Sequence, residues 1–129
     1  DVYREKKETT KHMSVMESQY QKWYAMQYVE NKQFGINIIQ SYRDTSRPVG
    51  TLEAKGSKEM RSLIIQNFYD NGKVWHRQGA SWLDDFEEEL LAFPQGVHDD
   101  QVDCMSYGGI VAQSMPLGIS DFGLAHEVY

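Results

Sequence analysis

Four residues within six positions have side chains suited to chemistry, and they are His98, Asp99, Asp100 and Asp103. A Pro-Gln-Gly turn precedes them, and a helix is predicted to begin directly after it. If this helix begins at Asp100, then Asp100 and Asp103 share one face, whereas Asp99 and Asp103, four apart, are the other possible pair. Crowded carboxylates repel one another unless a cation lies between them, and hard divalent ions prefer oxygen ligands. One Asp here would be explained by helix capping alone, but three beside a His favour a metal site.

The same stretch carries a family resemblance. Phe-Pro-x-Gly-x-His-Asp-Asp-x-x-Asp, from Phe93 to Asp103, follows an acidic segment rich in Leu. This pattern resembles the C-terminal nuclease domain of tailed-bacteriophage terminase large subunits, and the similarity covers residues 1 to about 113. The resemblance implies a ribonuclease H-like fold and an endonuclease that cuts concatemeric double-stranded DNA during genome packaging. It also implies an ATPase domain outside this chain, a small terminase subunit and a portal as partners, in the cytoplasm of the host cell.

A second acid follows from the resemblance. The segment 28–30 reads as a short strand that ends at Glu30, and in open α/β sheets sites gather at the carboxyl ends of strands. Terminase nucleases carry a metal-binding acid in such a strand-then-helix setting, so Glu30 looks like that residue. Without the resemblance it would be read as an exposed Glu at a strand end. The catalytic residues implied are Glu30, Asp99 and Asp100.

The remaining polar residues of the cluster have two possible roles each. Asp103 is either a metal ligand or a group that orients one. His98 either orients water or a phosphate or, as we prefer, orders the turn. Two Mg²⁺ or Mn²⁺ ions, roughly 4 Å apart, would activate the attacking water and stabilise the leaving oxygen. The family also places a first essential Asp on an opening strand that this chain is expected to lack, so full cleavage is expected to require upstream residues.

The charge is distributed unevenly along the 129 residues, whose net charge is −6. Residues 1–77 hold all 13 Lys and Arg and have a net charge of +4, whereas residues 78–129 have a net charge of −10. An acidic, metal-holding part beside a mildly basic part suits a nuclease. The basic residues Lys55, Lys58 and Arg61 cluster at a predicted helix start, where they either contact DNA phosphates or are ordinary surface charge.

The order of predicted elements indicates an α/β fold of ribonuclease H-like type, a mixed sheet flanked by helices and lacking its N-terminal strands. We expect one domain over residues 1–115 and a C-terminal tail over 116–129. A membrane-spanning run, a Walker A sequence and a zinc-type cysteine pattern are absent from the sequence, and its single cysteine excludes an internal disulfide. Strands are predicted at 28–30, 49–54 and 73–77, and helices at about 9–27, 36–43, 57–70, 81–91 and 100–115.

Several expectations concern burial. The stripe Met13, Met16, Tyr20, Trp23 and Tyr24 is predicted to face the core, as are Met60, Leu63, Ile64 and Phe68. His76 is read as a surface residue of a strand, Ser81 as the start of a capping box, and the acids 84, 85 and 87–89 as a solvated helix face. Two other functions remain open: another ribonuclease H-like nuclease of resolvase or transposase type, or a non-catalytic module that docks onto DNA or a portal.

Overall fold

The structure is a computed structural model that describes residues 2, 9–43, 45, 47 and 49–115. Residues 1 and 3–8, whose sequence reads as the end of a strand running into a polar turn, and the tail 116–129 lie outside the described residues. The contacts group the chain into two compact units, Asp1–Ser57 and Lys58–Tyr129. Each unit is described by itself.

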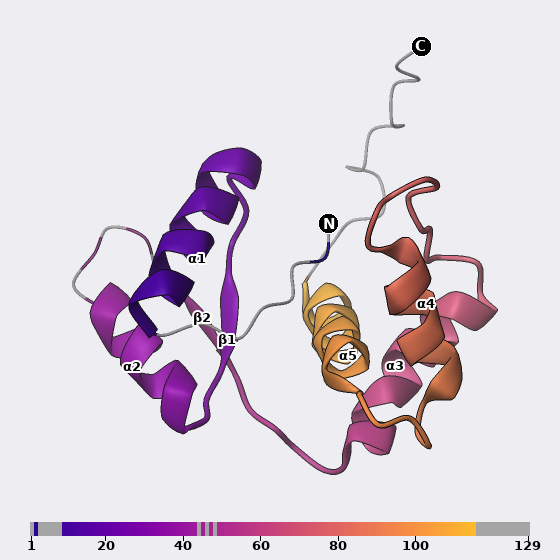
Figure 1. Ribbon diagram of the computed structural model, residues 1–129. Coiled ribbons are helices and arrows are strands. Elements are labelled where there is room, and N and C mark those ends of the chain that lie inside the picture. The colour runs from indigo at the N-terminus through magenta and orange to yellow at the C-terminus, as the bar shows by residue number, and fades with distance from the viewer. Residues whose placement is uncertain (1, 3–8, 44, 46, 48, 116–129) are drawn as a thin grey trace. The chain divides into compact units, whose positions relative to one another are not determined.

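The first unit contains two helices and a parallel strand pair (Figure 1). Its elements are α1 (Thr9–Trp23), β1 (Tyr28–Glu30), α2 (Gln33–Tyr42) and β2 (Gly50–Leu52). The strands pair in parallel with Tyr28 opposite Gly50 and Glu30 opposite Leu52. Parallel neighbours need a crossover, and α2 supplies it. The predicted mixture of helices and strands is therefore confirmed.

The interior of the first unit combines apolar and cationic groups. Ile38 and Tyr42 of α2 are buried, and the Arg47 guanidinium lies 4.4 Å from the Tyr20 ring and 4.5 Å from the Tyr42 ring. Arg47 also forms an ion pair with Glu17 of α1. This cation fixes the loop before β2 to both helices.

The predicted apolar stripe of α1 is wrong at its C-terminal end. The helix ends at Trp23, and Tyr24 adopts a φ of 50°, outside the right-handed helical region. The helical spacing therefore does not continue, and both side chains are exposed.

In the part of the second unit that the structure describes, residues 58–115, the helices are α3 (Lys58–Asp70), α4 (Leu83–Ala92) and α5 (Asp100–Ser114). Among the described residues, helices α3 and α5 make the most extensive contact, and each helix contains a fully buried small residue, Ser62 in α3 and Ser106 in α5. A Cβ on Gly109 would lie 3.3 Å from Cβ of Ile65, which is tighter than most real contacts. Gly109 therefore lets the two helix backbones approach closely.

The buried face of α3 differs from the predicted one. Met60 and Leu63 are 65% and 61% exposed, whereas Arg61, Ser62 and Ile65 are buried. The hydrophobic pattern alone misplaces this face because Arg61 is buried through an ion pair with α5, described below. The pairing of polar side chains decides how α3 is rotated about its own axis. The spacing of apolar residues in the sequence does not reveal such pairing.

The strand predicted at 73–77 is wrong. The helix α3 is followed by Gly72, whose φ of 63° favours glycine, and then by residues 73–77, which have no regular secondary structure. The capping box predicted at Ser81 is also not formed, because α4 begins at Leu83 after Trp82 and has no side-chain cap. The segment is held instead by contacts of His76.

Within the described ranges, no helix combines the length and apolar character that crossing a bilayer requires.

Candidate functional site

The acidic cluster lies where the sequence predicts, at the first turn of α5. Asp100 is the first helical residue, Asp99 is the N-cap residue, and the Asp103 backbone N–H donates to the Asp99 carbonyl at 2.9 Å. The preceding turn contains a cis peptide bond between Phe93 and Pro94. The Asp99 carboxylate makes no capping hydrogen bond to the helix backbone. Capping therefore does not explain why this residue is acidic.

Lys58 is the cation that meets these carboxylates. Its Nζ lies 2.5 Å from Oδ1 of Asp99 and 3.9 Å from Oδ1 of Asp100. The hydrogen bond with Asp99 raises the pKa of Lys58, with burial opposing it and the charges of Asp99, Asp103 and Asp100 adding to it. The side chain of Asp100 is 81% exposed, against 40% for Asp99. Asp100 thus presents its carboxylate to solvent beside a positively charged neighbour.

Asp103 points into the contact between α3 and α5. Its two oxygens accept three hydrogen bonds from the Arg61 guanidinium, with distances of 2.7 to 2.9 Å. Both side chains are almost completely buried, and the guanidinium lies 5.2 Å from the ring of Tyr107. This geometry suits a structural ion pair between helices.

The three residues of the predicted basic cluster, Lys55, Lys58 and Arg61, therefore lie in three different environments. Arg61 is buried against Asp103, which does not fit the expected contact with a DNA phosphate. Lys58 is partly exposed and paired with Asp99. Lys55 is exposed and belongs to the first unit, and its backbone N–H donates to the Glu53 carbonyl. Only the two lysines remain candidates for phosphate contacts.

Glu30 ends β1 in the first unit, as the sequence predicts. Its side chain is about a quarter exposed, and one oxygen lies 2.9 Å from Nζ of Lys32. The Lys32 backbone N–H donates to the Glu30 carbonyl, so the chain turns sharply from the strand toward α2. A Cβ on Gly35 would lie 1.9 Å from the Glu30 carbonyl oxygen, so α2 could not approach the strand this closely with any other residue.

His98 is exposed in the turn before α5. The carbonyl of His98 lies 3.2 Å from where a Cβ on Gly96 would be, so this turn is tight. Among the side chains that the structure describes, no three of His, Cys, Asp or Glu are grouped in a manner suited to hold a metal ion. Within the second unit, the adjacent Asp99 and Asp100 are the carboxylates that remain as candidate ligands.

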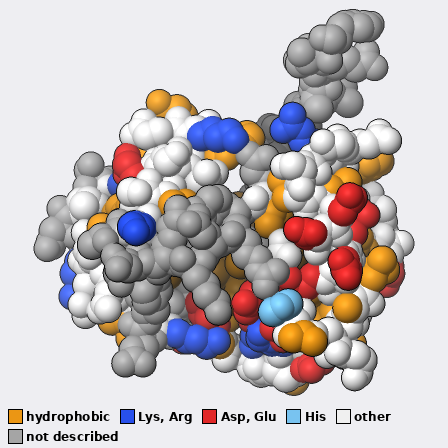
Figure 2. Space-filling view, in the orientation of Figure 1, with side chains coloured by type: hydrophobic (Ala, Val, Ile, Leu, Met, Phe, Trp, Pro, Cys, Tyr) orange, Lys and Arg blue, Asp and Glu red, His pale blue; other side chains and the backbone are white. Residues whose placement is uncertain are grey.

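The acids of α4 do not form one solvated face. Figure 2 shows acidic side chains gathered over the part of the surface that α4 occupies, and Asp84, Asp85 and Glu88 are exposed there as predicted. Glu89, however, is only 6% exposed. Its Oε1 accepts from the backbone N–H of Gln101 at 2.6 Å, and its Oε2 accepts from the Gln101 side chain at 2.7 Å. The prediction of a solvated residue is wrong for Glu89.

A second polar group in this unit was not predicted from the sequence. His76 lies between Tyr69 of α3 and Glu87 of α4, with Nε2 2.7 Å from the Tyr69 hydroxyl and Nδ1 2.7 Å from Glu87 Oε1. The imidazole also meets the Phe86 ring edge-on at 5.4 Å. His76 is therefore not a surface residue of a strand but the link between the 71–82 segment and two helices.

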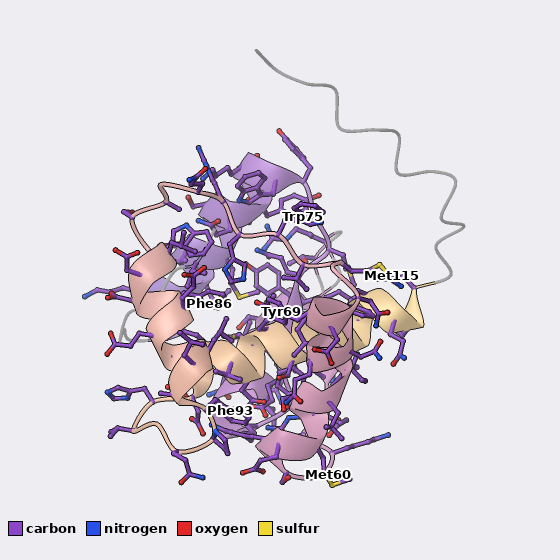
Figure 3. All side chains as sticks on the ribbon, turned by 90° about the vertical axis from the view of Figure 1, so that its right-hand side faces the viewer. Met60, Tyr69, Trp75, Phe86, Phe93 and Met115 are labelled. Carbon is purple, nitrogen blue, oxygen red and sulfur yellow. The ribbon has the colours of Figure 1, made fainter. Side chains whose placement is uncertain are left out.

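This group borders a pocket of about 490 Å³. The apolar part of its lining comes from Ile65, Leu90, Phe93 and Val102. Figure 3 labels Tyr69 and Phe93, which line it, and Phe86, which lies beside His76. Burial and the charge of Glu87 raise the pKa of Tyr69 above its usual value. The contacts of His76 with Tyr69 and Glu87 were not expected from the sequence, because the alternation that places Val74 and His76 on one side suggested a strand.

The chain matches no protein-family model, no curated protein and no solved structure.

Proposed function

We propose that this chain is a metal-dependent endonuclease domain of a phage terminase large subunit, with a ribonuclease H-like fold. Its substrate is double-stranded DNA, and its site takes two Mg²⁺ or Mn²⁺ ions. The observation that carries the proposal is the pair Asp99–Asp100, two adjacent carboxylates at a helix start, of which the N-cap residue Asp99 makes no capping hydrogen bond.

Two further features support the assignment. Glu30 is the last residue of a strand in a parallel pair, and the carboxyl ends of such strands are where α/β enzymes place their functional groups. Lys58 lies 2.5 Å from Asp99 and 3.9 Å from Asp100, so a basic side chain that could contact a DNA phosphate stands directly beside these carboxylates. The resemblance of the stretch 93–103 to terminase nucleases connects these carboxylates to phosphodiester chemistry.

In the proposed mechanism Glu30, Asp99 and Asp100 supply carboxylate oxygens, which hard divalent ions prefer. Such ions, when bound, activate water and stabilise the leaving oxygen of a phosphodiester. Lys58 pairs with Asp99 in the structure; with ions bound at that carboxylate, its ammonium would be available to a DNA phosphate, and Lys55 would be a further basic contact. Asp103 keeps α3 and α5 together through Arg61 and is not a ligand in this proposal.

The test compares Asp100→Asn and Glu30→Gln with a matched control, Asp84→Asn, which removes an exposed acid from α4. Each of the first two variants is expected to lower Mn²⁺-dependent plasmid cleavage by about 100-fold or more, and the control is expected to cleave like the parent. Mn²⁺ affinity, measured by electron paramagnetic resonance, should fall with activity.

Equal cleavage by all three variants would refute the proposal. A preference for branched over linear duplex DNA would instead favour the resolvase type of nuclease, and binding of DNA without any cleavage would favour a docking module.

A further inference from the structure

The pocket beside His76 is lined by residues of the second unit, and none of the residues proposed to act on DNA belongs to its lining. Its volume of about 490 Å³ is in the range of pockets that take small organic molecules. Such pockets combine mostly apolar walls with a few polar groups that fix the orientation of the ligand. The chemistry of the lining therefore indicates what kind of molecule this pocket takes.

The walls of the pocket are apolar, and all three helices contribute to them. Ile65 comes from α3, Leu90 and Leu91 come from α4, and Val102 comes from α5. Leu91 lines the pocket and is nevertheless 88% exposed, so the pocket is open to solvent at this residue. A ligand with an apolar body that covers Leu91 removes this side chain from water, which is favourable.

Two oxygen atoms of the lining have no hydrogen-bond partner among the described residues. Glu87 uses Oε1 for His76, whereas its Oε2 accepts from no described residue, and this side chain is 46% exposed. The second oxygen is Oε1 of Gln66. The Ser62 hydroxyl donates to the Glu59 carbonyl, so it accepts from Nε2 of Gln66, and this bond fixes which atom of the amide is the oxygen.

The charge of the lining is negative. Glu87 is its acid, and no Lys or Arg is found among the described residues that form the pocket. Both ring nitrogens of His76 are already used, one by Glu87 and one by the Tyr69 hydroxyl. The exposed acids Asp84, Asp85 and Glu88 lie on the same helix as Glu87, in the acidic part of the surface seen in Figure 2.

These features discriminate between classes of ligand. An anionic ligand would be repelled by Glu87. A neutral apolar ligand would cover the free oxygen of Glu87 without replacing its hydrogen bonds to water, which is unfavourable. A protonated amine carries the opposite charge and three N–H donors, so it satisfies the carboxylate that it covers.

We propose that this pocket binds a small organic cation, which has an apolar body and ends in a protonated amine. The body lies against Ile65, Leu90 and Leu91, and the ammonium group donates to Oε2 of Glu87. His76 holds the same carboxylate through Oε1, so the free oxygen is already fixed before the ligand binds. The proposal is independent of the proposed nuclease function, because it uses neither the acids at the start of α5 nor a metal ion.

Three probes that share one apolar body separate charge from burial: phenylbutylammonium, phenylbutanol and phenylbutyrate. Each is titrated into the full chain at about pH 7, where the amine is protonated and the carboxylate ionised. Salt at about 0.15 M screens long-range attraction to the acidic surface. Amide chemical shifts, followed by nuclear magnetic resonance, report both the affinity and the location of binding.

The parent chain is expected to bind the amine at least about 3-fold more tightly than the alcohol and at least about 10-fold more tightly than the carboxylate. Shift changes should concentrate at Gln66 and at residues 90–93, which line or adjoin the pocket. Equal binding of the amine and the alcohol would overturn the role of Glu87. No binding of any probe up to about 10 mM would overturn the pocket as a ligand site.

Variants of α4 test the two parts of the site. Glu87→Gln retains an oxygen for His76 and removes the charge, and Glu88→Gln is the matched control at the adjacent exposed acid. Glu87→Gln is expected to reduce the preference for the amine over the alcohol to within about 2-fold, whereas Glu88→Gln should retain it. Leu91→Ser should weaken both probes by about 3-fold or more and keep the preference, because it removes apolar wall alone.

An equal loss in Glu87→Gln and Glu88→Gln, or shift changes confined to residues 84–88, would mean attraction to the acidic surface alone and would overturn the proposal. If Glu87→Gln does not fold, Leu91→Lys decides the same question, because it places a positive charge on a lining residue that is already exposed. This variant should lose the preference for the amine, and a retained preference would contradict the proposal. None of these measurements uses DNA or a metal ion, so a failure of the nuclease proposal leaves their outcome unaffected.

Discussion

Replacing Arg61 with Met removes the cation from a buried ion pair and is expected to destabilise the second unit strongly. The guanidinium makes three hydrogen bonds to Asp103, and the two side chains are 6% and 11% exposed. Removing one partner of such a pair leaves an uncompensated buried charge and costs about 3–5 kcal/mol. A domain of this size has only about 5–15 kcal/mol in total, so the variant should lose a large part of its stability.

The matched double variant separates the ion pair from its surroundings. Arg61→Met with Asp103→Leu removes both charges together and fills the space with apolar groups, which is often neutral or stabilising by about 1–4 kcal/mol. The Met side chain can also contact Tyr107, whose ring the guanidinium faces at 5.2 Å. We therefore expect the double variant to be at least as stable as the parent within about 1 kcal/mol.

Urea unfolding followed by circular dichroism measures all four proteins of this cycle: the parent, both single variants and the double variant. The coupling energy between the two positions should be at least about 3 kcal/mol. A single variant that loses less than about 1 kcal/mol, or a double variant whose loss equals the sum of the single losses, would refute the description of a dry ion pair. Cleavage by the double variant would also show that Asp103 is not a required ligand.

Two further predictions concern α3 and α5. The folded protein raises the pKa of Lys58 above 10.5, so its interaction with Asp99 stabilises the fold below that pH and is lost as the pH rises through the folded value. Urea unfolding at about pH 8 and about pH 11 should therefore show a smaller alkaline loss in Lys58→Met than in the parent, and equal losses would contradict this. Gly108 and Gly109 form a matched pair, because a Cβ on Gly108 meets nothing within 4 Å whereas one on Gly109 meets Ile65 at 3.3 Å. Thermal unfolding should show Gly108→Ala more stable than the parent by about 0.5–1 kcal/mol and Gly109→Ala less stable than Gly108→Ala by about 1–3 kcal/mol; the reverse order would rule out the close helix contact.

Local signals in the sequence determined several elements correctly. The segment 28–30 is a strand and α5 begins at Asp100, because an apolar strand ending in Glu and a Pro-Gly turn followed by acids are patterns that act over a few residues. The presence of both helices and strands was also predictable from the changing periodicity. The ribonuclease H-like arrangement of the whole chain remains a prediction from the resemblance.

The environments of the charged residues were not predictable in the same way. The sequence treats Glu87, Glu88 and Glu89 as three equal acids on one helix, yet Glu88 is exposed, Glu87 binds His76 and Glu89 is buried at the start of α5. Their different environments follow from which helix each side chain meets. No feature within α4 itself contains that information.

The sequence by itself determined which residues are acidic and placed them at the start of a helix, whereas their binding of divalent cations stays a prediction. Only the tertiary structure showed that the three Asp side chains have different surroundings. Asp103 is neutralised by Arg61 inside the contact between α3 and α5, Asp99 faces Lys58, and Asp100 faces solvent. The physical reason is that the stability of a charge depends on its burial and on the partners within a few ångströms. Those partners come from residues 40 or more positions away in the chain, where a local pattern gives no information.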